Sequence, residues 1–286
     1  METKKNITLL HSLINLVDDE DWDIFNQIRG KIIDFGIDAI PYLEEAWEIK
    51  GYGDEFQNRI EDIIHELQFT DVSTGIVNWV KNGSKDLLTG LLLVSKYQYP
   101  EIDVKKIRRQ VKVYCNEFSK ILDNRLSSHQ KIAQLNNYVF EKLRFRGDNS
   151  NYYSPDNSIF SSVIFRKKGN PLLISLFYKL IANGNDINIV GINLPRHFIV
   201  GLKDKNKEIL FYLSPFNRGS FLSEEEIQDY LNKLNLPFEE TYFQECNNLD
   251  MIKRVLLNLM NSYKKAKKME QLKDVSYLYE LIKSVD

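Results

Sequence analysis

The chain has 286 residues, and its 38 Lys and Arg against 40 Asp and Glu give a formal net charge of −2 at pH 7. This balance argues against a nucleic-acid-binding protein, because such proteins usually carry a basic excess. No segment approaches the run of about 20 apolar residues that spans a bilayer. The first residues also lack the apolar core of a signal peptide. We therefore expect a cytoplasmic protein that binds neither nucleic acid nor membrane.

Residues that could bind a metal or form a disulfide are few and scattered. The two cysteines, Cys115 and Cys246, are far apart, and the four histidines form no CxxC-type or HExxH-type motif. Isolated cysteines are typical of a reducing compartment. We expect reduced thiols, no metal and no cofactor.

The first 85 residues predict helices, because apolar residues such as Phe25, Ile28 and Ile32 recur at spacings of three and four. The break at Gly36, followed closely by Pro41, resembles the link between paired helices of a HEAT repeat, although no fixed period is present. The sequence predicts a helical, HEAT-like domain over this stretch, and the alternative is an irregular helical domain.

Two longer helices are predicted over residues 103–123 and 128–143. A polar loop rich in turn-forming residues follows over residues 146–158. Its Asp-Asn-Ser end could line a pocket, but such residues more often end a loop and cap a helix.

The following helix, over residues 171–183, has a well-marked start. Asn170 can cap it, and Pro171 suits the first helical position, where the missing N–H costs nothing. Apolar residues lie on most sides, so we expect this helix to be buried. Three runs with strand character follow, over residues 187–194, 197–203 and 208–213.

The last 40 or so residues return to a helical pattern with two apolar stripes, one beginning at Leu249 and the other at Leu272. The pair predicts an antiparallel helical hairpin, which could be one tetratricopeptide-like unit.

Six short motifs follow one another along the chain: LLLVSKY at 91–97, PEID at 100–103, YYSPDNS at 152–158, RKKGNP at 166–171, LPRHF at 194–198 and LSPFNRG at 213–219. In this order and spacing they resemble the SirB-type branch of the transglutaminase-like superfamily over residues 88–286. The resemblance implies a papain-like core followed by a tetratricopeptide-like region.

The predicted fold is therefore α+β and predominantly helical. A papain/transglutaminase-like core, with a buried helix against a small antiparallel sheet, is flanked by a helical N-terminal domain and a C-terminal helical hairpin. The predicted domains are residues 1–85, 86–245 and 246–286.

Working members of the superfamily use a Cys-His-Asp set, and the resemblance places Pro171, His197 and Ser214 at those three positions. A cysteine at the start of a buried helix is favoured as a thiolate, a histidine accepts its proton, and an acid orients the histidine. Pro171 has no nucleophile and Ser214 has no charge. We interpret Cys115 and Cys246 as structural residues that do not replace the missing nucleophile. We therefore interpret the chain as a pseudoenzyme.

We predict a non-catalytic protein- or peptide-binding regulator or scaffold. Its groove would be formed by His197, Asn157, Ser214 and Asn217. One alternative is a hydrolase or transferase of the same fold that uses His197 without a cysteine nucleophile. Another is a purely structural helical adaptor in which the core is only a spacer. Instead of lining a groove, His197 could simply be hydrogen-bonded to Ser214 or a carbonyl inside a filled core.

Overall fold

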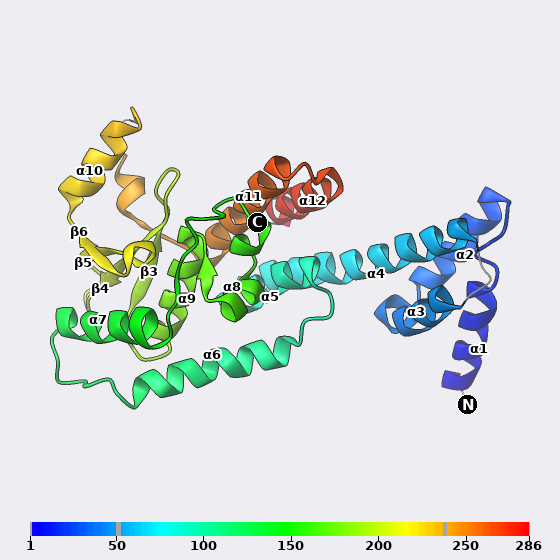
Figure 1. The fold of residues 1–286 in the computed structure, drawn as a ribbon, viewed down its shortest axis with the longest axis horizontal. Helices are drawn as coiled ribbons and strands as arrows, with labels where there is room; N and C mark the ends of the chain where they lie inside the picture. The colour runs from blue at the N-terminus through cyan, green and yellow to red at the C-terminus, as the bar shows by residue number, and fades with distance from the viewer. Residues whose placement is uncertain (1, 50–52, 237–238, 286) are drawn as a thin grey trace. The chain divides into compact units, whose positions relative to one another are not determined.

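A computed structural model describes residues 2–49, 53–236 and 239–285 (Figure 1). The chain divides into two compact units, Met1–Gly75 and Ile76–Asp286. Their boundary lies inside one long helix, α4 (Asp54–Lys81). The division into residues 1–85, 86–245 and 246–286 stays a prediction.

The first unit is entirely helical in its described residues. Asp21 caps its second helix, because its carboxylate accepts a hydrogen bond from the backbone N–H of Asp23 at 2.9 Å. Gly36, at φ +66°, follows that helix in the left-handed conformation that glycine adopts most readily. The elements are α1 (Glu2–Ile14), α2 (Trp22–Ile33), a 3-10 turn (Gly36–Ala39), α3 (Ile40–Glu48) and the first part of α4.

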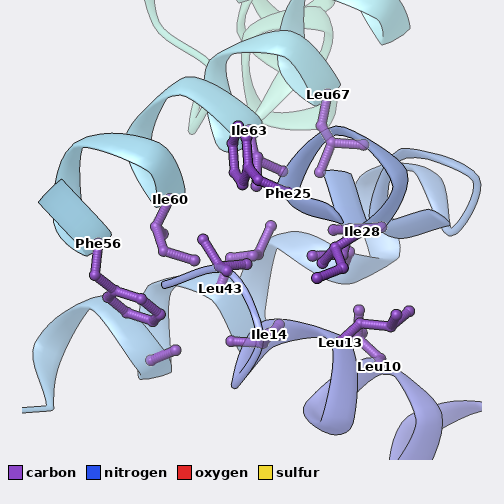
Figure 2. Packing of buried hydrophobic residues seen from close by; sticks show 14 residues of the cluster. Leu10, Leu13, Ile14, Phe25, Ile28, Leu43, Phe56, Ile60, Ile63 and Leu67 are labelled. Atoms are coloured by element: carbon purple, nitrogen blue, oxygen red, sulfur yellow. The ribbon is translucent and has the colours of Figure 1, made fainter. Parts of the chain in front are cut away.

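Figure 2 shows the core of this first unit, where apolar side chains of all four helices meet. Arg59 is buried at its edge and donates hydrogen bonds to the backbone carbonyls of Val17 and Asp19. The helical prediction for this part is confirmed, and the HEAT-like interpretation stays a prediction. The labelled core residues are Leu10, Leu13, Ile14, Phe25, Ile28, Leu43, Phe56, Ile60, Ile63 and Leu67.

The second unit begins with a helical lead-in to the core. Of the two helices predicted here, the first ends at Ser119, before the polar residues Asp123 and Asn124. The second continues into a turn of π-helix over Asn137–Lys142. The lead-in helices are α5 (Leu87–Gln98), α6 (Val104–Ser119) and α7 (Ser128–Asn136).

The core is a buried helix, α9 (Pro171–Asn183), packed against a five-stranded antiparallel sheet (Figure 1). This confirms the predicted fold class. A separate pair of two-residue parallel strands, β1 (Arg146–Gly147) and β2 (Lys168–Gly169), joins the loop to the segment before α9. In spatial order the sheet contains β6 (Ser220–Leu222), β5 (Ile209–Ser214), β4 (Ile199–Lys203), β3 (Ile189–Ile192) and β7 (Glu245–Cys246).

The remaining helices cover the core. α10 (Glu224–Lys233) buries Ile227 and Leu231 against the sheet. The C-terminal α11 (Asn248–Lys265) and α12 (Met269–Val285) form the expected hairpin, and α11 also contacts α5. A short helix, α8 (Phe160–Arg166), precedes β2. None of the described helices is both long and apolar enough to cross a membrane.

Candidate functional site

A cavity of about 450 Å³ lies at the start of α9. Four segments of the second unit form it: the loop before α8, the cap of α9, the turn before β4 and one face of α11. Its lining residues are Tyr152, Tyr153, Ser158, Asn170, Arg196, Arg254, Leu257, Asn258, Asn261 and Ser262.

Asn170 connects the start of α9 to the loop. Its side-chain oxygen accepts a hydrogen bond from the backbone N–H of Leu173 at 2.9 Å, which caps the helix. Its amide nitrogen donates to Oγ of Ser158, also at 2.9 Å. Both Asn170 and Ser158 are buried. The cavity wall is therefore held by hydrogen bonds that also define the helix start.

A partly buried ion pair holds the loop in place behind this wall. Arg166 donates to the carboxylate of Asp148 at 2.8 Å and to the side-chain oxygen of Asn157 at 3.2 Å. Burial alone would raise the pKa of Asp148, but hydrogen bonds from Ser150 and Asn151, together with the Arg166 charge, lower it overall. We call Asp148, Arg166 and Asn157 the loop clamp.

Asn157 is thus placed inside the loop clamp. It is fully buried, and its amide nitrogen donates to the backbone carbonyl of Asn151 at 2.7 Å. The residue that reaches the cavity lining is its neighbour, Ser158.

Arg196 enters the cavity from a tight turn before β4. The backbone N–H of His197 donates to the carbonyl of Leu194 at 3.2 Å, and Arg196 has φ +59°. Proline at the second position and a positive φ at the third are the features of a type II turn. That conformation costs a residue with a side chain about 1–2 kcal/mol, so an arginine here is conformationally unfavourable.

Arg254 reaches the same cavity from α11 and is half-buried. Burial lowers the pKa of its guanidinium, and Tyr230, Tyr152 and Cys246 partly oppose that effect. Among the described residues, no carboxylate forms an ion pair with Arg254 or Arg196. Among the residues that the structure describes, the cavity lining therefore contains two guanidinium groups and no acid.

His197 lies beside the cavity, next in sequence to Arg196. Its ring centroid is 5.9 Å from that of Tyr230, whose hydroxyl donates to the carbonyl of Pro195 at 2.9 Å. Burial lowers the pKa of His197, and the positive charge of Arg254 lowers it further. The ring makes no side-chain hydrogen bond within the described ranges, so the imidazole is unpaired. Because its pKa is lowered, it is also neutral at pH 7.

The other two triad positions are not joined to this histidine. Pro171 is buried at the first position of α9. Ser214 is fully buried at the end of β5, and its hydroxyl has no hydrogen-bond partner in residues 2–49, 53–236 and 239–285. In the sheet Leu213 pairs with Val200, so Ser214 lies beyond that pair, near the start of β4. Because Ser214 makes no hydrogen bond, it does not orient His197.

Asn217 lies in the short 3-10 helix Pro215–Asn217 and is exposed. Neither Asn217 nor Ser214 is among the residues that line the cavity. Of the predicted ligand residues, His197 alone is beside it, while Asn157 supports its wall from behind.

These features place a buried helix start near a histidine that lies just before a strand of an antiparallel sheet. The family described as the transglutaminase-like superfamily matches residues 105–257, which is more than half of the chain. This chain belongs to the transglutaminase-like superfamily.

Curated proteins from bacteria and mammals are similar to parts of this chain. The chain is 27% identical over 183 residues to a UPF0162 protein of Xylella fastidiosa, a match that covers 62% of this chain and 64% of that protein. A second Xylella fastidiosa UPF0162 protein is 29% identical over 143 residues, or 50% of each chain. F-box only protein 21 of Mus musculus is 25% identical over 197 residues, covering 67% of this chain and 28% of that protein.

The chain therefore spans between half and two thirds of the UPF0162 proteins it matches first. No solved structure matches it.

The two thiols of this transglutaminase-like chain contact backbone carbonyls outside the cavity. Cys115 lies within hydrogen-bonding distance of the carbonyl of Leu180, and Cys246 donates to that of Gly191 at 3.3 Å. Burial raises the pKa of both thiols, that of Cys246 to about 12. Neither thiol lines the cavity, and at neutral pH both are protonated and weakly nucleophilic.

Ser175 is also unsuited to nucleophilic chemistry, because it is fully buried within α9 and its hydroxyl has no hydrogen-bond partner among the described residues. Among the described residues, no group of three or more His, Cys, Asp and Glu side chains could hold a metal.

Sequence reasoning missed the two arginines of the cavity. Arg196 could have been noticed, because a Pro-Arg pair directly before a strand places a long cation at a turn position that favours glycine. Arg254 gave no such signal, since charged residues are common on the exposed faces of helices. Its half-buried position depends on the loop and the turn that pack over α11.

Proposed function

We propose that this transglutaminase-like protein is non-catalytic and binds a peptide segment of a protein partner in the cavity at the start of α9. One observation carries the proposal. The position that the resemblance assigns to the nucleophile holds Pro171, which is buried, while a cavity of about 450 Å³ remains beside it. A retained cavity without a nucleophile favours binding over covalent chemistry.

The size and lining of the cavity support a peptide ligand. Its volume falls within the range of about 300–1,000 Å³ found for ligand sites. Tyr152 and Tyr153 provide aromatic surface, and Asn258 and Asn261 provide amides that can pair with a peptide backbone. Tyrosine and asparagine are residues that recognition surfaces use for such contacts.

The finer classification is part of the same proposal. We assign the chain to the SirB-type branch, with α11 and α12 as a tetratricopeptide-like hairpin and the first unit as a HEAT-like domain. A cytoplasmic regulator or scaffold is the role that these assignments favour.

A second candidate is a hydrolase or transferase that uses His197 as a general base without a covalent step. The observation in its favour is the imidazole itself, which is neutral, unpaired and beside the cavity. Against it, no acid among the described residues orients the ring, and orientation contributes strongly to base catalysis.

Peptide selection with a random phage-displayed library on the full chain tests the binding proposal. Asn258→Trp fills the cavity from α11, and Lys264→Trp places the same side chain on an exposed position of that helix. We expect the selected peptides to bind the wild type and Lys264→Trp alike and to bind Asn258→Trp at least about tenfold more weakly. Recovery of no peptide, or equal binding to both variants, would refute the cavity as a peptide site.

The absence of catalysis is tested separately with a thiol-reactive probe and an amide substrate. Cys115→Ser and Cys246→Ser are the controls. We expect no turnover of the amide substrate, and therefore no labelling of a cysteine by the probe that correlates with turnover. Turnover that one of these serine variants abolishes would establish a thiol enzyme, and turnover that only His197→Gln abolishes would establish the second candidate.

A further inference from the structure

We propose that the cavity at the start of α9 recognises a carboxylate of its peptide ligand, with Arg254 as the binding group and Arg196 at the rim. This inference rests on the proposed function and adds the chemical class of the ligand. The carboxylate can come from an Asp or Glu side chain or from the C-terminus of a chain.

The first argument is the charge of the lining. Arg196 and Arg254 both line the cavity, and its other lining residues are tyrosines, asparagines, serines and a leucine. A third cation lies next to it, because Nζ of Lys265 is 2.9 Å from the ring centroid of Tyr153. The overall chain has a net charge of −2, so this is a local concentration of positive charge on a slightly acidic protein. Such a concentration attracts anions.

The second argument is that Arg254 is half-buried and has no counter-ion in the part of the chain that the structure describes. A guanidinium removed from water is costly unless an anion pairs with it. The phenols of Tyr152 and Tyr230 do not neutralise it, because burial raises the pKa of both and keeps them protonated at pH 7. Cys246 is protonated for the same reason. The unbound cavity therefore holds an uncompensated cation that a bound anion would neutralise.

The third argument concerns the rim. Arg196 occupies a left-handed turn position at φ +59°, where glycine would be less strained. The long side chain at that position lines the cavity. The strain is thus associated with a cation that faces the same space as Arg254. Two arginines can hold one carboxylate, and the planar guanidinium binds both oxygens at once.

The asparagines and tyrosines favour a peptide carboxylate over an inorganic anion. Asn258 and Asn261 lie on the same helix as Arg254 and can pair with amide groups next to the carboxylate. Tyr152 and Tyr153, which are in edge contact with ring centroids 5.1 Å apart, provide the apolar surface that a side chain would cover.

Three peptides test the inference with the full chain. The first is acetyl-Ala-Ala-Tyr-Ala-Glu-amide, the second is its Gln counterpart, and the third is the Gln peptide with a free C-terminal carboxylate. Calorimetric titration at low and high salt measures their affinities. We expect at least one carboxylate peptide to bind more than tenfold more tightly than the neutral peptide, and salt to weaken that difference. Comparison of the first and third peptides identifies the source of the carboxylate.

Variants connect the effect to Arg254. Arg254→Met should weaken the preferred carboxylate peptide by about 30-fold or more, because one partner of a desolvated charge pair is removed. The neutral peptide should be unaffected, and Lys264→Met on the exposed face of the same helix should change neither affinity. The melting temperature of Arg254→Met should equal or exceed that of the wild type, since an unpaired charge is replaced by an apolar side chain of similar length.

The outcomes separate the two proposals. Equal affinity for the Glu and Gln peptides would overturn the carboxylate inference and leave peptide binding intact. Equal loss of both peptides in Arg254→Met, together with a lower melting temperature, would make Arg254 a structural residue and would also overturn it. Failure of all three peptides to bind would overturn it as well, whereas the proposed function is decided by the phage selection with Asn258→Trp.

Discussion

Replacing Arg166 by methionine should destabilise the second unit substantially while leaving the cavity residues themselves unchanged. Arg166 is the centre of the loop clamp, and its guanidinium is 2.8 Å from the carboxylate of Asp148. The Asp148 side chain is 4% exposed and that of Arg166 is 32% exposed. Methionine keeps the length and most of the apolar contact of arginine, so the substitution mainly removes the charge and the hydrogen bonds.

The magnitude follows from what remains around Asp148. Removing one partner of a fully buried ion pair costs roughly 3–5 kcal/mol. Two features reduce that figure here. One third of the Arg166 side chain is in contact with water, and Asp148 still accepts hydrogen bonds from Ser150 at 2.9 Å and Asn151 at 3.4 Å. We expect a loss of about 2–3 kcal/mol in the free energy of unfolding at pH 7.

The loss should depend on pH. In the wild type the folded-state pKa of Asp148 is below its ordinary value of 3.8. Its contribution to stability is therefore present above that value and is lost as the pH falls through the lower folded-state pKa. Without Arg166 the folded-state pKa rises, so less stability remains to be lost. The difference between wild type and variant should narrow as the pH falls below about 4.

Urea unfolding followed by the fluorescence emission of Trp79 measures the loss of unfolding free energy in the second unit. Trp79 is buried and belongs to the second unit. Trp22 and Trp47, both exposed, are replaced by phenylalanine in wild type and variant. A loss below about 0.5 kcal/mol, the usual limit for surface substitutions, would refute the loop clamp as a stabilising group. A difference that grows at low pH would refute the assigned direction of the pKa shift.

Three further predictions concern single positions. Pro171→Cys should lose no more than about 1 kcal/mol of stability and should show no amide turnover in a coupled assay, because the histidine lacks an orienting acid. In the folded state the pKa of His197 is below its ordinary value of 6.5, so protonation of this histidine opposes folding below that pH. Lowering the pH from 7 to 5 should therefore reduce the melting temperature of the wild type more than that of His197→Gln. A Cβ on Gly147 would clash with the ring of Phe216, so Gly147→Ala should cost roughly 1–3 kcal/mol in urea unfolding, whereas Gly30→Ala, with open space around it, should not destabilise.

The start of α9 could be predicted from the sequence because its signals are local. Asn170 provides the cap, Pro171 occupies the first position, and the apolar residues that follow identify a buried helix. The three main strands and the C-terminal hairpin were likewise marked by short-range periodicity. In each case the hydrogen-bonding and burial pattern of a segment is determined within about a dozen neighbouring residues.

The remaining features depend on contacts between distant segments. The two-residue strand β7 pairs with β3 across more than 50 residues, and nothing in Glu245 or Cys246 indicates that pairing. Asn157 looked like a groove residue because it is polar and lies in a loop, but its partners are Arg166 and Asn151. Polar side chains inside a fold are hydrogen-bonded to whatever tertiary packing provides, so their role cannot be inferred from residue type.

The helix start and the two arginines have a common electrostatic consequence. The N-terminal end of a helix favours negative charge, which is the reason a thiolate is stabilised there in a working thiol enzyme. Pro171 removes the residue that would carry that anion. Arg254 and Arg196 add positive charge at the same end of α9, and no acid among the described lining residues offsets it. A site without an anion of its own, but with a field that favours one, is suited to a ligand that brings the negative charge. On the proposed function, the carboxylate of a partner would occupy the electrostatic role that a covalently attached thiolate has in the enzymes this chain resembles. The binding of such a carboxylate would also bring a negative charge close to His197, so the pKa of that histidine should rise when the cavity is filled.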